Sequence, residues 1–266
     1  MKYSCSYLIN IRFLGFRLHG WQKQPNLKTV HFNVDKTLKF VLEGTRFKTV
    51  GVGRTDAKVS AMNYPLQLFV DDILDVDTFI ESFNRNSPSD LQLLQVRKIK
   101  DTSFNIIQHE KVKEYHYYFS NEGKNHPFCA AFMTGYSGLD IDLMKEGAKL
   151  FEGIHYFGAY CSKPSKETKL TRTIDSCEIV ENDIHQASFF PENSFVFKVR
   201  GKGFLRYQVR LMMGALIELG SGQMTLDDIK ESFIEKEVRT SIATIVPGSG
   251  LQLHAVEFKN LDDFLV

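Results

Sequence analysis

The apolar residues follow a strand period and a helix period in turn, and this alternation most limits how the chain can fold. Residues 6–13 alternate polar and apolar side chains, as in a strand with one buried face. A helix pattern follows, with Thr29 as a typical N-cap and apolar residues at every fourth position from Val30 to Leu42. Further patterns predict strands at 48–52 and 64–69, a short helix at 77–84 and a strand at 91–99.

That order, βαββαβ, is a ferredoxin-like unit, and the second half of the chain repeats it. The patterns there predict a strand at 115–119, a helix at 143–151, strands at 173–180 and 194–200, a helix at 204–219, a capped helix from Thr225 and a last strand at 251–258. The sequence therefore predicts an α+β protein with two ferredoxin-like halves, residues 1–105 and 106–266. We expect their antiparallel sheets to join edge to edge, because joining removes two exposed edges and creates an active-site cleft between the halves.

Composition excludes several classes of protein. The chain has 266 residues, 43% of them hydrophobic, which is enough for a sizeable core. Its 4 cysteines lie far apart without a C-x-x-C pair, so they indicate reduced thiols and not a zinc or redox motif. No apolar run reaches transmembrane length and the N-terminus lacks a signal pattern, so we expect a cytoplasmic protein without a membrane partner. His19, His31 and His155 lack the spacing of a metal site and are expected to be hydrogen-bonded structural residues.

The charge is balanced overall and unevenly placed. A net charge of +1 argues against a protein that coats nucleic acid without selectivity. Residues 198–210 nevertheless hold five basic residues and no acid. A neutral total with one basic segment fits a site-specific contact to phosphates.

Asp56 is the first candidate for chemistry. It lies in a glycine-punctuated loop, residues 51–57, between two apolar strands, where small residues let a ligand approach the backbone. Arg54 and Thr55 can supply hydrogen bonds to an anion or to the loop itself. The alternative is an Asx-type turn whose aspartate bonds its own backbone, and the loop alone does not exclude it.

Two other segments could meet a nucleic acid. The apolar stripe of the helix at 204–219 leaves Arg206 and Arg210 one turn apart on a polar face, with Lys202 close by. This face could meet phosphate or an aspartate, or the helix could be an amphipathic core helix with solvated arginines. Tyr115 shares a strand face with Tyr117, and such a tyrosine could stack on an RNA base or belong to the core.

Trp21 is the only tryptophan, and it lies in a loop with Lys23 between the first strand and the first helix. A surface loop of this composition suits nucleic-acid contact. A tryptophan in a loop can equally be a hydrophobic plug.

These segments, in this order, resemble the TruA family of tRNA pseudouridine synthases. The resemblance runs through most of the chain and rests on residues 19–24, Thr29-Val30, Gly53–Ala57, Pro88-x-Asp90, Tyr115-x-Tyr117, Gly153-x-His155-x-Phe157, Arg172–Ile174, Gly203–Leu205 with Val209-Arg210, Gly214, and Pro247 with Gly250-Leu251. Each motif alone is weak. Together they are highly specific.

The resemblance implies a mechanism. Asp56 matches the family's essential aspartate, which is expected to act as nucleophile on a flipped-out uridine while the N-glycosidic bond breaks and a C–C bond forms. Tyr115 matches the active-site tyrosine expected to stack on the target base. Arg210 matches the arginine expected to pair with the aspartate and keep it ionised. Nothing is oxidised or lost, so the isomerisation needs no cofactor and no metal.

The resemblance also implies the partners. The expected substrate is tRNA, with target uridines in the anticodon stem-loop, bound by a homodimer that shares one tRNA between its subunits. The side chains that we expect in the RNA cleft or beside the target are Arg17, Trp21, Lys23, Arg54, Thr55, Lys58, Lys202 and Arg206.

The sequence departs from the family pattern at three places. Phe13–Phe16 stands where the family usually has Tyr-Asp-Gly-Thr, Lys58-Val59-Ser60 where it has Gly-Val-His, and Phe104–Ile107 where it has Phe-His-Ala-Arg. The departures leave an alternative open, an RNA-binding or RNA-folding protein of the same fold with weak or no catalysis. A hydrolase that uses Asp56 with a second carboxylate is a further alternative, which no paired-acid motif nearby supports.

Overall fold

The structure is a computed structural model that describes residues 3–101, 103–236 and 240–266. It contains two compact units, unit 1 (Met1–Lys111 with Leu253–Val266) and unit 2 (Val112–Gln252). The described residues form ten strands and five α-helices, so the predicted α+β class is confirmed. No helix among them is long and apolar enough to cross a membrane.

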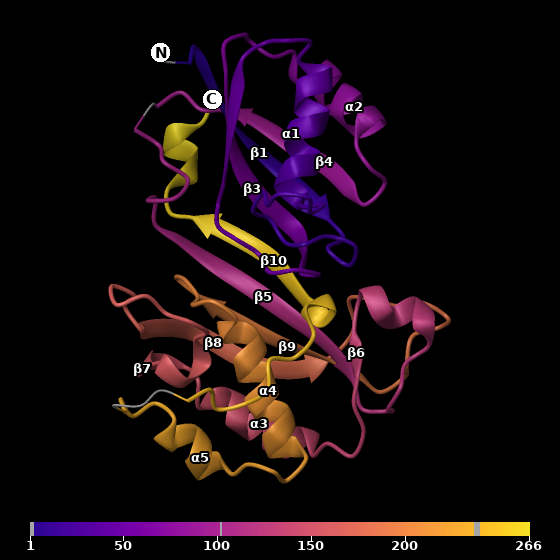
Figure 1. Cartoon of the computed structure of the whole chain (residues 1–266), viewed down its shortest axis with the longest axis vertical. Helices are drawn as coiled ribbons and strands as arrows, with labels where there is room; N and C mark the ends of the chain where they lie inside the picture. Colours follow the sequence, from indigo (N-terminus) through magenta and orange to yellow (C-terminus); the bar gives the residue numbers. More distant parts are fainter. Residues whose placement is uncertain (1–2, 102, 237–239) are drawn as a thin grey trace. The chain divides into compact units, whose positions relative to one another are not determined.

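Unit 1 has the predicted order βαββαβ. Its elements are β1 (Cys5–Phe13), α1 (Val30–Val41), β2 (Phe47–Gly51), β3 (Ser60–Val70), α2 (Val76–Asn86) and β4 (Leu91–Lys98). The strands lie in the order β4-β1-β3-β10, and β2 pairs with β3. Figure 1 shows α1 and α2 side by side on this unit. The Thr29 side chain accepts a hydrogen bond from the Phe32 amide, which confirms the predicted N-cap.

The C-terminal segment packs on unit 1 although it comes last in the sequence. Phe104 contacts Phe258 and Phe264, with ring centroids 5.6 and 5.7 Å apart. His109 lies 4.9 Å from the ring of Phe264 and bonds the carbonyl of Lys259 at 2.7 Å. This aromatic cluster explains why residues 253–266 belong to unit 1. The division into halves at residue 105, the joining of their sheets and the cleft between them stay predictions.

Unit 2 carries the second set of strands. Its elements are β5 (Lys111–Ser120), β6 (Thr134–Gly135), α3 (Ile141–Lys149), β7 (Gly153–Tyr156), β8 (Thr171–Glu181), β9 (Ser194–Gly201), α4 (Gln208–Gly220) and α5 (Leu226–Glu231), and β10 (Leu251–Phe258) leads back to unit 1. The strand order is β5-β9-β8-β7, with β6 beside β5. Helix α3 packs against α4 and β8 (Figure 1). Thr225 and Asp228 form the predicted capping box.

Helix α4 begins later than the hydrophobic pattern predicts. It starts at Gln208 and not at Phe204, because Tyr207 has a left-handed backbone with φ +63°. The Gln208 side chain turns back and accepts a hydrogen bond from the Leu205 amide at 2.8 Å. Arg206 therefore precedes the helix, and the prediction that Arg206 and Arg210 lie one turn apart on one helix face is wrong.

Candidate active site

The Asp56 loop connects β2 to β3, and backbone hydrogen bonds hold it on both sides of the aspartate. The Trp21 amide donates to the Thr55 carbonyl at 3.2 Å, and the Lys58 amide donates to the Leu18 carbonyl at 3.0 Å. The Asp56 carbonyl closes a turn by accepting from the Val59 amide at 3.3 Å. The turn is thus made by the main chain, and the half-buried side chain is not needed to close it.

Two glycines let the loops around Asp56 pack backbone against backbone. A Cβ at Gly20, where φ is +78°, would lie 2.4 Å from the Thr55 carbonyl oxygen. A Cβ at Gly15 would lie 2.0 Å from the Val59 carbonyl oxygen. Both distances are far below van der Waals contact, so any side chain at either position would displace the Asp56 loop.

Trp21 supports this loop from inside unit 1. Its side chain is only 3% exposed, and its ring stacks between His31 at 4.9 Å and Tyr64 at 4.2 Å. The Tyr64 hydroxyl donates to the Gly53 carbonyl at 2.5 Å. Of the two interpretations of Trp21, the structure has the hydrophobic plug.

The cations predicted to meet RNA from unit 1 differ in their surroundings. Arg17 donates to the Asp90 carboxylate at 2.8 Å, with its own side chain 70% exposed. Lys23 pairs with Asp35. Lys58 is exposed, has φ +67°, and places its Nζ 5.7 Å from the ring centroid of Phe16.

Arg54 and Thr55 precede Asp56 in the loop. Arg54 is exposed, whereas Thr55 is half-buried. The Thr55 hydroxyl is a buried atom without a hydrogen-bond partner among the described residues. A hydroxyl in this condition can bond a ligand that reaches the loop.

Arg210 is held at two points within unit 2. Its Nε donates to the Val246 carbonyl at 2.7 Å, and its guanidinium lies 5.0 Å from the Tyr207 ring. Arg206 lies over the same ring at 5.1 Å and is exposed, as is Lys202. Sequence reasoning did not find Tyr207, and its left-handed backbone leaves no signal in the apolar pattern.

Tyr115 and Tyr117 lie on β5, opposite Val199 and Phe197 of β9. Tyr115 is 9% exposed, and its ring meets Phe204 edge to face at 5.1 Å. Tyr117 is fully buried and donates its hydroxyl to the Pro247 carbonyl at 3.0 Å. Burial raises the pKa of Tyr117 well above its usual value, so it remains a neutral structural donor.

The segment 244–247 is a second feature that sequence reasoning did not connect to the site. Its consecutive carbonyls at Val246 and Pro247 accept from Arg210 and Tyr117. A Cβ at Gly214 of α4 would lie 2.2 Å from the Thr244 carbonyl oxygen. The glycine therefore lets α4 contact this loop closely, four residues after Arg210.

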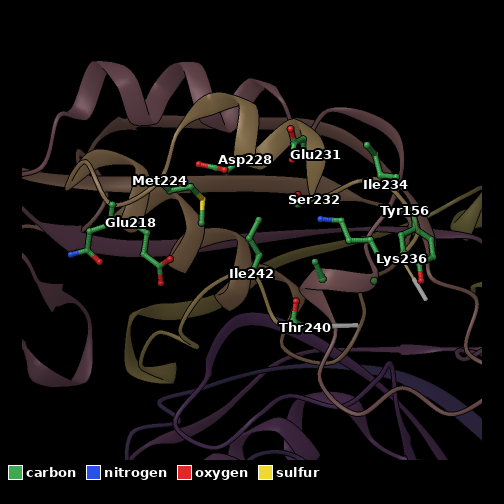
Figure 2. Close-up of a pocket in the computed structure, with 13 residues that line it drawn as sticks. Tyr156, Glu218, Met224, Asp228, Glu231, Ser232, Ile234, Lys236, Thr240 and Ile242 are labelled. Carbon is green, nitrogen blue, oxygen red and sulfur yellow. The ribbon is translucent and has the colours of Figure 1, made fainter. Parts of the chain in front are cut away.

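A pocket of about 370 Å³ lies elsewhere in unit 2, beside α5 and the end of α4, and Figure 2 shows the residues that line it. Glu218, Asp228, Glu231 and Lys236 are its charged lining residues. None of the site residues predicted from the sequence is among the described residues that line this pocket. A mainly acidic lining also does not favour phosphate.

The family model and the sequence relatives agree on one family. The sequence model of a family described as tRNA pseudouridine synthase matches residues 148–259. A protein named tRNA pseudouridine synthase A 2 from Bacillus cereus is 31% identical over 256 residues, which cover 95% of this chain and 99% of that protein. A tRNA pseudouridine synthase A from Listeria monocytogenes is 28% identical over 254 residues, again with 95% and 99% covered. A chain of the solved Cbf5-Nop10-Gar1 complex gives a TM-score of 0.33 at 16% identity, over 79% of this chain and 45% of that one.

Proposed function

This chain belongs to the family of tRNA pseudouridine synthases, and from that premise we propose that it isomerises uridine in tRNA with Asp56 as the nucleophile. The enzyme class is isomerase. The observation that carries the assignment of Asp56 is the backbone packing of its loop, in which hydrogen bonds and close glycine contacts hold the aspartate on both sides. A loop held in this way fixes the backbone that carries the carboxylate, so less rearrangement must precede the reaction.

The reaction conserves every atom of the substrate. Asp56 attacks the flipped-out nucleotide, either at the base or at C1′ of the ribose, and the bond between N1 and C1′ breaks. The base turns, C5 bonds to C1′, C5 loses its proton while N1 takes one up, and Asp56 is released. No electron acceptor or donor takes part, so the proposed chemistry uses protein side chains alone.

We assign supporting roles to Tyr115 and Arg210. Tyr115 stacks on the target base, with Phe204 orienting its ring from the side. Arg210 pairs with Asp56 and favours the ionised carboxylate, which desolvation under the base would otherwise disfavour. Its bond to Val246 and its contact with Tyr207 direct the guanidinium.

The tRNA contacts follow from exposure and charge. Arg17, Lys23, Arg54, Lys58, Lys202 and Arg206 are exposed cations, and we assign them to the phosphate backbone, with Thr55 beside the target. Trp21 acts by holding the Asp56 loop. The anticodon stem-loop is the proposed target region, the proposed assembly is a homodimer, and the proposed compartment is the cytoplasm.

Mapping pseudouridine in unmodified tRNA tests the function. After incubation with the protein, carbodiimide treatment and primer extension should give new stops at discrete uridines. No stop in any RNA of a total pool, together with retained tRNA binding, would refute the catalytic function and support an RNA-binding or RNA-folding protein of the same fold.

A further inference from the structure

Phe16 and Lys58 come from separate loops and meet beside the proposed nucleophile. Lys58 follows Asp56 by two residues, so their Cα atoms lie within about 7 Å of each other. The Lys58 Nζ lies 5.7 Å from the centroid of the Phe16 ring. Lys58 is exposed and Phe16 is half-buried, so the pair forms part of the surface around the loop.

The backbone of Lys58 has a conformation that favours glycine. Its φ is +67°, and its amide is committed to the Leu18 carbonyl at 3.0 Å, so the turn has little freedom to relax. Glycine would adopt this turn without strain. A long cationic side chain is present instead, and backbone strain of this kind concentrates at functional sites.

The two loops are held together, which keeps the backbones of Phe16 and Lys58 close. The Gly15 amide donates to the Ser60 hydroxyl at 2.9 Å. A Cβ at Gly15 would also lie 2.0 Å from the Val59 carbonyl oxygen. Phe16 directly follows Gly15 in the sequence, and Lys58 directly precedes Val59.

Lys58 also differs from Arg17 and Lys23 in what it contacts. Arg17 is paired with Asp90 and Lys23 with Asp35. Lys58 makes no ion pair with a carboxylate among the residues that the structure describes, and its neighbour is an aromatic face. A ring attracts an ammonium without neutralising it, which leaves N–H donors for an anion on the open side.

We propose that Phe16 and Lys58 form a phosphate-binding subsite for the RNA strand that carries the target uridine. The ammonium of Lys58 binds a backbone phosphate close to the flipped nucleotide, and Phe16 is a positioning residue that holds the ammonium in place. A compact ammonium suits a single phosphate contact. The subsite rests on the proposed function, because the phosphate it binds belongs to the strand presented to Asp56.

The salt dependence of tRNA binding tests the subsite. We expect Lys58→Gly to reduce the slope of log K against log salt by about 0.7 to 0.9, the contribution of one phosphate contact. Lys58→Arg should keep the wild-type slope. Phe16→Leu should also keep the slope, since the cation remains, and should weaken binding by about threefold through loss of the ring's attraction. In turnover, Lys58→Gly should raise KM more than it lowers kcat.

Two comparisons keep the result decisive. Lys39→Ala removes another exposed lysine of unit 1, on α1, and should leave the slope unchanged. Lys58→Gly should melt no lower than wild type because glycine relieves the backbone strain, so misfolding would not explain weaker binding.

An unchanged slope in Lys58→Gly, or an equal loss of slope in Lys39→Ala, would overturn the subsite even if the wild-type protein makes pseudouridine. A wild-type protein that binds tRNA without turnover would overturn the proposed function alone.

Discussion

Single residues with unusual backbones stand beside two proposed catalytic residues. Lys58 has φ +67° two positions after Asp56, and Tyr207 has φ +63° three positions before Arg210. A non-glycine residue in this region costs roughly 1–2 kcal/mol. In both cases the side chain contacts a group with a proposed role in binding or catalysis. The placement of that side chain at the site therefore outweighs the cost of the strained backbone to local stability.

Replacing Tyr207 by asparagine separates these two effects. Asparagine tolerates the left-handed backbone, so Tyr207→Asn should stay folded, with a melting temperature lowered only by the lost ring contacts. The variant loses the ring under Arg210, a contact worth about 0.5–2 kcal/mol, so kcat should fall by roughly 2- to 30-fold. Single-turnover rates and thermal melts would check both. Wild-type turnover with intact folding would show that the ring does not position Arg210.

At the scale of elements, the sequence predicts long periodic segments well and short ones poorly. The strands and helices of unit 1 follow the predicted order because each spans enough residues to show a period. The strands β6 and β7 have only 2 and 4 residues and were not predicted. The start of α4 was misplaced because Leu205 continues the apolar stripe through a turn that is not helical.

The same distinction holds for the candidate site, where the sequence predicts local motifs but not contacts between distant residues. The loop of Asp56 and the identity of Arg210 could be read from motifs. The support of Arg210 by the Val246 carbonyl could not, because it joins residues 36 positions apart through a loop without periodicity. The burial of Trp21 depends on stacking against Tyr64, a contact that only the folded unit reveals.

Because α4 contacts segment 244–247 closely, we expect one added methyl group on α4 to lower the melting temperature. Gly214→Ala should favour the helix by about 1 kcal/mol through propensity alone. The added Cβ would meet the Thr244 carbonyl oxygen at 2.2 Å, and overpacking of this kind costs about 1–3 kcal/mol. We therefore expect a lower melting temperature. Gly203→Ala is the matched control, since a Cβ there meets no atom within 4 Å. A melting temperature raised by Gly214→Ala would contradict the close contact.

His31 makes the support of the Asp56 loop dependent on pH. Burial lowers the pKa of His31, with the Asp35 carboxylate opposing this and Lys23 adding to it. The unfolded chain therefore binds a proton more readily, so stability is complete above about pH 6.5 and falls as the pH drops below it. His31→Gln should lose less stability than wild type between pH 7.5 and 5.5 in urea unfolding. An equal or larger loss in the variant would show that His31 does not titrate in this way.

At the scale of the molecule, several cations are balanced by acidic neighbours. Arg46 pairs with Asp71 at 2.7 Å, Arg200 lies 3.5 Å from Glu114, and Lys198 stands opposite Glu178 on the neighbouring strand. The basic segment at 198–210 is thus less basic in the fold than in the sequence. The net charge of +1 is modest for a protein that binds a polyanion, which supports our proposal that two chains share one tRNA.

Turnover by Asp56→Asn tests the central claim most directly. Wild-type protein and the variant would be incubated with the same unmodified tRNA, and pseudouridine and tRNA binding would be measured in parallel. The amide keeps the shape of the side chain but is not a nucleophile, so we expect no detectable pseudouridine and a binding constant within a few-fold of wild type. Turnover near the wild-type rate would remove Asp56 from the reaction.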